Sequence, residues 1–153
     1  MVTITSNSPE ATHELGLKWA GEMEQGWIVG LSGDLGAGKT QLVKGLAEGW
    51  KIQDPVASPT FTLIHEYRAE KATIYHLDLY RLESQDAIWD AGMAEYLRSP
   101  MPGWVMVEWI DRWTIESLQQ HTRVPDVKKP FRWVHIDGDL DNQRRISYED
   151  FRD

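Results

Sequence analysis

The chain has 153 residues, and its 16 lysines and arginines against 24 aspartates and glutamates give a formal net charge of −8 at pH 7. This length predicts a single domain over residues 1–153, because chains of about 150 residues usually build one core. The acidic excess disfavours unaided binding to a polyanion such as RNA, and the absence of cysteine excludes a disulfide framework and a thiolate zinc site.

Export and membrane attachment are not predicted from the sequence. No apolar run approaches the ~20 residues of a membrane span, and the first residues lack the basic start and apolar core of a signal peptide. The absence of cysteine also fits a reducing compartment. We therefore expect a soluble, cytoplasmic protein.

The first half of the chain has the pattern of a helix, a strand, a glycine-rich loop and a second helix. Ser-Pro-Glu at residues 8–10 supplies an N-cap, a first-turn proline and a carboxylate that matches the helix dipole, which predicts a helix to about Met23 that Gly26 ends. The apolar segment 27–32 predicts a short strand. After the glycine-rich loop, residues 40–49 place their apolar side chains on one helical face and predict a helix.

The second half predicts mostly strands. Residues 60–68 and 72–81 are rich in β-branched and aromatic side chains, and the short linker between them predicts a hairpin. Ser84 is expected to cap one continuous helix over residues 84–98. Three further strands are predicted, at residues 104–110, 132–137 and 144–150.

The glycine-rich loop G-D-L-G-A-G-K-T matches the phosphate-binding pattern G-x-x-x-x-G-K-[ST], and a strand and a helix flank it as that pattern requires. Its glycines let backbone N–H groups point at phosphate oxygens, and the following helix adds its positive end. Lys39 then supplies a mobile charge for the outer phosphates, and the Thr40 hydroxyl is placed to bind Mg²⁺. The candidate nucleotide-binding residues are Gly33, Asp34, Leu35, Gly36, Ala37, Gly38, Lys39, Thr40 and Gln41. A glycine-rich turn without a ligand is the alternative.

The expected nucleotide is ATP or ADP. A GTPase normally carries a D-x-x-G switch and an N-K-x-D guanine-binding motif, and the chain contains neither string. Adenine has no equally sharp motif, so the preference for ATP depends on this absence.

Two acidic residues end apolar strands and are candidates for catalysis and for Mg²⁺. Asp78 shares a strand face with His76 and Tyr80, and Glu108 follows four apolar residues. Phosphoryl chemistry needs a carboxylate near the metal and a group that orients the attacking water. Either residue could instead cap a neighbouring helix or face water. The metal role is favoured for Glu108, because a carboxylate beside a buried strand needs a compensating partner.

Other residues have two interpretations each. Thr60, in Ser-Pro-Thr, belongs to a local turn or senses the γ-phosphate as a switch residue, and composition favours the turn. Trp109 is a core residue or contacts the base. Arg132 belongs to a solvated basic stretch or to a contact surface for nucleotide or partner. His65 and His76, like the other histidines, lack metal-ligand spacing, so surface or satisfied core positions are expected.

Four blocks in this order resemble the TsaE family, the small bacterial ATPases of tRNA threonylcarbamoyladenosine synthesis. They are G-D-L-G-A-G-K-T, S-P-T-F-T-L-I-H-E-Y, H-L-D-L-Y-R-L and V-E-W-I-D-R, within a match from about Thr12 to Arg112. The resemblance implies an α/β domain of the P-loop NTPase type, with a mixed central sheet flanked by helices. It also implies that ATP and Mg²⁺ bind at the glycine-rich loop.

The resemblance further assigns roles to single positions. Magnesium would be held by Thr40 and Glu108, with Asp78 as a further acidic residue that shares the metal and base roles with Glu108. Thr60 becomes an expected switch element. Nucleotide contacts are implied around Ser6 to Thr12 and around Arg132 to Trp133. Two positions depart from the family pattern, Gln41 where threonine is frequent and Ile110 where proline or alanine is frequent.

The resemblance also implies partners. The family acts with TsaD-like and TsaB-like proteins, so tRNA would be reached only through the complex, in agreement with the acidic charge. The expected activity is an ATPase that is weak alone and stimulated by these partners. A small-molecule kinase and a nucleotide-dependent interaction module are the alternatives.

Overall fold

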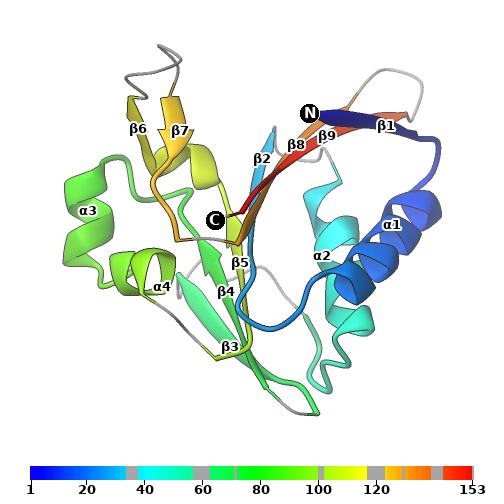
Figure 1. Cartoon of the computed structure of the whole chain (residues 1–153), viewed down its shortest axis with the longest axis horizontal. Helices are drawn as coiled ribbons and strands as arrows, with labels where there is room; N and C mark the ends of the chain where they lie inside the picture. The colour runs from blue at the N-terminus through cyan, green and yellow to red at the C-terminus, as the bar shows by residue number, and fades with distance from the viewer. Residues whose placement is uncertain are drawn as a thin grey trace.

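A central sheet organises the molecule (Figure 1). The computed structural model describes residues 1–33, 38–56, 63–70, 72–99, 102–116, 123–128, 130–138 and 143–152. Within these ranges the sheet has the order β1-β9-β8-β2-β5-β4-β3. Its strands are β1 (Val2–Ser6), β2 (Ile28–Gly33), β3 (Ile64–Arg68), β4 (Thr73–Asp78), β5 (Trp104–Glu108), β8 (Phe131–Gly138) and β9 (Arg144–Phe151).

The sheet is mixed, with parallel strands at its centre. β2 runs parallel to both of its neighbours, β5 and β8, and β4 runs parallel to β5. The outer pairs, β3 with β4, β8 with β9 and β9 with β1, are antiparallel. The carboxyl ends of β2, β4 and β5 therefore lie along one edge, which is where open α/β sheets place their ligands.

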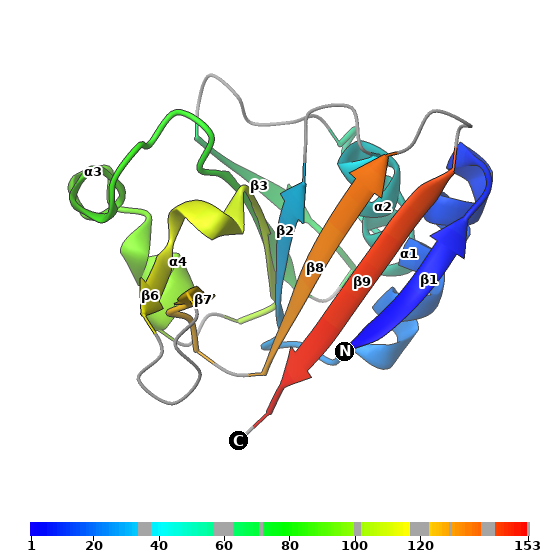
Figure 2. The same cartoon turned by 90° about the horizontal axis from the view of Figure 1, so that it is seen from above.

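Helices cover both faces of the sheet. They are α1 (Pro9–Glu22), α2 (Lys39–Gly49), α3 (Gln85–Asp90), α4 (Ala94–Arg98) and the 3₁₀ turn η1 (Ile110–Arg112), beside a small sheet of β6 (Thr114–Glu116) and β7 (Arg123–Pro125). Figure 2 shows α1 and α2 behind β1, β9 and β8. One core includes Leu42 and Leu46 of α2, and the core on the other face includes Ile88 of α3 and Leu97 of α4. The predicted mixed sheet flanked by helices is confirmed.

Close contact between α1 and α2 fixes the place of α2 on the sheet. A Cβ on Gly45 would collide with the carbonyl oxygen of His13, and one on Gly16 would collide with that of Leu42. Glycine at these positions lets the two backbones touch without side chains between them. The backbone of α2 is therefore held against that of α1 at Leu42 and Gly45.

Most predicted elements are present, but several predicted ranges were wrong, and the strand predicted over 72–81 ends at Asp78. Ser8 caps α1 as predicted, since its Oγ accepts from the N–H of Ala11 at 3.0 Å. The single helix predicted over 84–98 is two helices, because Gly92 adopts a left-handed φ of +79° between them. The strand predicted to continue to residue 110 ends at Glu108, because Trp109 is also left-handed. β1 and the pair β6 and β7 were not predicted.

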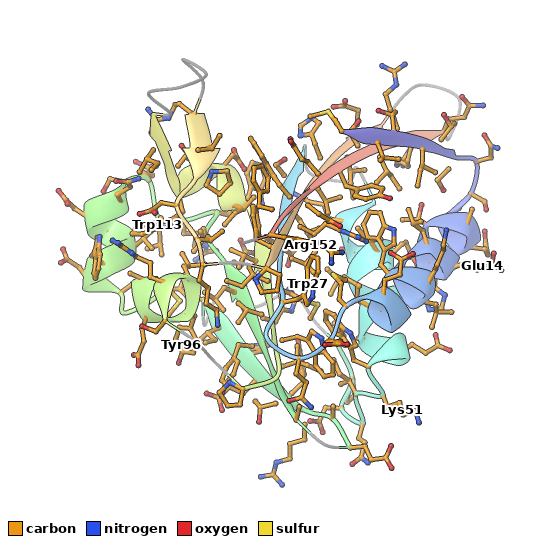
Figure 3. The ribbon with its side chains drawn as sticks, viewed as in Figure 1. Glu14, Trp27, Lys51, Tyr96, Trp113 and Arg152 are labelled. Atoms are coloured by element: carbon orange, nitrogen blue, oxygen red, sulfur yellow. The ribbon has the colours of Figure 1, made fainter. Side chains whose placement is uncertain are left out.

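The far end of α2 closes in a Schellman motif, near Lys51 in Figure 3. The N–H of Ile52 donates to the carbonyl of Ala47 at 3.0 Å, and that of Lys51 donates to Glu48 at 3.0 Å. Lys51 has the positive φ of 60° that this motif requires, a conformation usually taken by glycine.

Among the helices of the described ranges, none has the length and apolar character needed to span a membrane.

Candidate functional site

The two ends of the glycine-rich loop are held by β2 and α2. Gly33 ends β2 with a φ of +132°, and Gly38 precedes α2 with a φ of +99°. A Cβ on Gly33 would collide with the carbonyl of Ile136 on β8, so the sheet itself requires glycine there. Asp34, Leu35, Gly36 and Ala37 lie outside the described residues, and their predicted roles stay predictions.

The side chain of Lys39 connects the two ends of the loop. Its amino group donates to the carbonyl of Gly33 at 2.9 Å and lies 3.9 Å from the centroid of the Trp109 ring. Lys39 is only 5% exposed. A buried ammonium needs such compensation, here from a carbonyl oxygen and an aromatic face. The structure thus brings together two of the predicted site residues, Lys39 from α2 and Trp109 from the end of β5.

The two predicted carboxylates lie side by side. Asp78 and Glu108 end the neighbouring parallel strands β4 and β5 and are direct register partners. Both are buried, at 5% and 6% exposed, so neither faces water. Oδ1 of Asp78 accepts from the N–H of Tyr80 at 2.9 Å, and Oε2 of Glu108 hydrogen-bonds Nε2 of His76 at 2.8 Å. His76 is therefore a satisfied core histidine, as expected, and its partner is a candidate site residue.

Backbone strain is concentrated at this pair. The non-glycine residues with positive φ in the described ranges are Lys51, Leu63 and Trp109. Trp109 follows Glu108 directly, and the carbonyl of Leu63 accepts from the N–H of Asp78 at 3.0 Å. A left-handed conformation costs such residues roughly 1–2 kcal/mol, and strain of this kind clusters at functional sites.

A pocket of about 600 Å³ opens beside the start of α2. It is lined by Asn7, Ser8, Pro9, Thr12, Gly38, Thr40, Gln41 and Arg144. The segment from Ser6 to Thr12 therefore lies next to Thr40 and Gln41, which is the neighbourhood that the resemblance implied. The pocket wall is internally bonded, since the hydroxyls of Ser6 and Thr12 are 2.7 Å apart.

Arg144 is a pocket residue that sequence reasoning missed. Its Nε lies 3.5 Å from where a Cβ on Gly38 would stand, so the guanidinium group is beside the residue that precedes α2. The side chain comes from the start of β9, which pairs with β8 rather than with β2. No local pattern in the sequence indicates this proximity, because the pairing of distant strands creates it.

Arg132 is not brought to the loop. Its register partner on β2 is Val29, whereas Gly33 pairs with Ile136, roughly 13 Å further along β8. Its guanidinium group donates to the two carboxylate oxygens of Asp150 at 2.6 and 2.8 Å and to Glu22 at 3.2 Å. Burial acts to lower the pKa of Arg132, but the bonds and charges of Asp150 and Glu22 outweigh it and raise the pKa. This buried ion pair fits neither a solvated arginine nor a residue that lies beside the loop.

The remaining predicted residues divide between the site and the undescribed ranges. Thr40 is exposed at the start of α2, and Thr60 lies outside the described residues. Trp133 is the register partner of Gly30, three residues before the end of β2. Within the described ranges, no group of three or more histidine, aspartate or glutamate side chains could hold a metal ion alone. A magnesium site of one or two carboxylates completed by phosphate oxygens remains compatible with Asp78 and Glu108.

Comparison with known proteins gives a consistent result. Residues 6–145 match the family model described as "Threonylcarbamoyl adenosine biosynthesis protein TsaE". A protein of Nostoc sp. named "tRNA threonylcarbamoyladenosine biosynthesis protein TsaE" is 43% identical over 114 residues, covering 73% of this chain and 70% of that protein. A protein of the same name from Rickettsia conorii is 34% identical over 143 residues, covering 93% of this chain and 74% of that protein.

A solved structure resembles the whole architecture. The crystal structure of YdiB from Bacillus subtilis superposes with a TM-score of 0.68 at 28% identity, covering 96% of this chain and 83% of that one. The similarity therefore includes the late strands β8 and β9, beyond the stretch that carries the sequence blocks.

Proposed function

The chain belongs to the TsaE family of tRNA threonylcarbamoyladenosine biosynthesis, and from this premise we propose that it is a P-loop ATPase. In this proposal residues 33–40 bind the phosphates of ATP, and hydrolysis drives or resets a step of tRNA modification. The chemistry is phosphoryl transfer to water, in which positioning and charge stabilisation supply most of the rate.

One observation carries the proposal: a buried lysine and two buried carboxylates meet the start of a helix at one edge of the sheet. Lys39 lies between Gly33 and Trp109, Glu108 ends β5 next to β2, and Asp78 ends β4 on the other side of β5 along that edge. A triphosphate with Mg²⁺ needs cationic groups for its oxygens and carboxylates for the metal. Few other ligands need both within one small site.

The pocket beside α2 accounts for the rest of the nucleotide. Its volume of about 600 Å³ is within the range of small-molecule sites, and its walls combine the polar residues Asn7, Ser8 and Gln41 with the ring of Pro9. Arg144 adds a cation beside Gly38. We assign the base and ribose to this pocket and the β- and γ-phosphates to the loop.

Each residue then has a defined part. Lys39 leaves the Gly33 carbonyl for the outer phosphates, and the Thr40 hydroxyl and the Glu108 carboxylate hold the metal. Bound Mg²⁺ would neutralise charge that develops on the phosphate oxygens. Asp78 and Glu108 together orient the attacking water. Thr60 is the proposed switch residue that responds to the γ-phosphate.

Partners are part of the proposal. TsaD-like and TsaB-like proteins would supply the tRNA site and stimulate hydrolysis. The net charge of −8 supports this division, because a protein with this charge is poorly suited to hold tRNA alone.

The test compares two lysines of the same helix. ATP binding is measured by calorimetry, and hydrolysis is measured alone and with the TsaD-like and TsaB-like proteins. We expect Lys39→Ala to abolish hydrolysis, whereas Lys44→Ala, on the exposed face of α2, behaves as wild type. Unchanged hydrolysis in Lys39→Ala, or a wild-type chain that binds no ATP, would contradict the proposal.

A further inference from the structure

A line of hydrogen-bonded side chains crosses three strands and ends on Glu108. The hydroxyl of Tyr67, on β3, lies 3.1 Å from Nδ1 of His65 and 3.3 Å from Nδ1 of His76. Nε2 of His76, on β4, lies 2.8 Å from Oε2 of Glu108, on β5. Tyr67 and His76 are 4% and 1% exposed, so water has little access to the Tyr67–His76 and His76–Glu108 bonds.

These side chains lie on the sheet face that carries α2. Tyr67 belongs to the core on that face, together with Ile74 of β4 and Met106 of β5, which flank His76. A hydroxyl and an imidazole placed in an apolar core destabilise it unless their hydrogen bonds are satisfied. Apolar side chains in place of Tyr67 and His76 would avoid this cost. The two polar side chains instead connect, through hydrogen bonds, to the Glu108 carboxylate of the candidate site.

For an ionised Glu108 carboxylate and a neutral His76 ring, the hydrogen bonds have one direction. An ionised carboxylate can only accept, so Nε2 of His76 donates to Glu108. In a neutral ring Nδ1 then accepts, and the Tyr67 hydroxyl donates to it. The oxygen of Tyr67 in turn accepts from Nδ1 of His65. The Glu108 carboxylate thus selects the tautomer of His76, and the Tyr67 hydroxyl satisfies the acceptor that this tautomer leaves on Nδ1.

We propose that His76, held by Tyr67, is a positioning residue that orients the Glu108 carboxylate toward the bound metal and phosphates. The proposal depends on the proposed function for what Glu108 acts on, while the hydrogen-bonded line itself is independent of it. A bond to one carboxylate oxygen fixes the rotation of the carboxylate and so aims its second oxygen. At metal sites in general, removal of a side chain that orients a ligand in this way lowers metal affinity or activity by about 10- to 100-fold.

The experiment uses two variants of His76 that differ in one hydrogen bond. His76→Leu removes the donor, whereas His76→Gln keeps an N–H that can reach Glu108. We expect His76→Leu to lower kcat by about 10- to 100-fold and to raise the Mg²⁺ concentration for half-maximal hydrolysis by a similar factor. ATP affinity measured in EDTA stays within about twofold, because the metal contact is absent there. His76→Gln recovers most of the lost kcat.

Tyrosine variants supply a matched pair. Tyr67→Phe removes only the hydroxyl and should lower kcat by about two- to tenfold, a smaller effect than loss of the imidazole because His76 keeps its place. Tyr75→Phe is the control, since Tyr75 lies on the opposite face of the same sheet and packs against Tyr96. Its kcat and Mg²⁺ requirement should match wild type.

Two outcomes would overturn the proposal. One is a His76→Leu protein with reduced unfolding free energy but unchanged kcat and Mg²⁺ requirement, which would make the line purely structural. The other is a His76→Gln protein whose kcat is no higher than that of His76→Leu. This result would show that the hydrogen bond to Glu108 does not affect hydrolysis.

A nucleotide-free measurement separates this proposal from the proposed function and also applies if His76→Leu fails to fold. Nitrogen-15 NMR of the wild-type imidazole should show a proton on Nε2 and none on Nδ1, and Glu108→Gln should shift the His76 resonances. A ring protonated on Nδ1 alone would refute the orientation argued above, whether or not ATP is hydrolysed. A correct tautomer in a chain that neither binds nor hydrolyses ATP would instead contradict the proposed function.

Discussion

Two buried cations, Arg132 and Lys39, lie in different surroundings. The guanidinium group of Arg132 lies against the rings of Trp19 and Tyr148, which contact each other, and donates to Asp150 and Glu22. Lys39 rests on a backbone carbonyl and a tryptophan ring, at the strand edge where the pocket opens. Burial of charge is therefore not what distinguishes a site. Its distinguishing features here are the carboxyl ends of parallel strands, a helix start and a cavity.

The sharpest test of this contrast is Asp78→Asn, on the Lys39 side. Asparagine keeps the acceptor for the Tyr80 N–H, so the unfolding free energy should change by less than about 1 kcal/mol. Partner-stimulated ATP hydrolysis should fall by about 10³-fold, equivalent to roughly 4 kcal/mol of transition-state stabilisation. Asp90→Asn, at the exposed end of α3, is the control, and hydrolysis that survives Asp78→Asn would remove this carboxylate from the site.

The reverse result is expected for Arg132→Met. The substitution leaves the carboxylate of Asp150 without its bidentate partner and should lower the unfolding free energy by about 2–3 kcal/mol, measured by urea denaturation. The folded fraction should bind ATP as wild type does. Arg152→Met is the control, since Arg152 is exposed and stacks on Trp27 beside the same aspartate (Figure 3). Weakened ATP binding by folded Arg132→Met would return this residue to the nucleotide site.

Arg144→Ala tests the edge of the pocket. Removing the guanidinium group beside Gly38 should weaken ATP binding by about tenfold, or roughly 1.4 kcal/mol, with little change in kcat. Its neighbour Arg145 is exposed, and Arg145→Ala should leave the calorimetric affinity unchanged. Equal effects of the two substitutions would indicate a general charge effect rather than a pocket contact.

The smallest expected change is a gain in stability at the far end of α2. Lys51→Gly should raise the unfolding free energy by about 0.5–1 kcal/mol, because glycine adopts the left-handed conformation without strain. Lys44→Gly, within the same helix, should lower it by about 1 kcal/mol. ATP hydrolysis should be unaffected by Lys51→Gly, and opposite signs in thermal denaturation would confirm the assignment of the motif.

Local signals in the sequence predicted the elements well where one residue type determines the backbone. Ser8 caps α1, and the hairpin of β3 and β4 is where the β-rich segments indicated. The break at Gly92 was missed because the helical pattern continues on both sides of it. β1 was missed although Val2 to Ser6 alternate apolar and polar side chains, which is the pattern of a half-buried strand.

The chemical identity of the site residues was predictable, but their neighbours were not. Lys39, Asp78 and Glu108 follow from motifs and strand ends. Arg144 and His76 depend on register: β9 must pair with β8 to bring Arg144 to Gly38, and β4 must pair with β5 to bring His76 to Glu108. His65 and His76 are eleven positions apart and look unrelated in the sequence, yet they are direct partners across the hairpin.

The glycine contact between α1 and α2 has a mechanical consequence for the pocket. Ser8 and Pro9 begin one helix and Gly38 precedes the other, so both walls belong to a pair of helices whose backbones touch at Gly16 and Gly45. Two backbones in direct contact have no side chain that could change rotamer and let them slide. Sliding of these helices past each other is therefore disfavoured, and the backbone strain of the site lies elsewhere, at Leu63 and Trp109 beside the ends of β4 and β5.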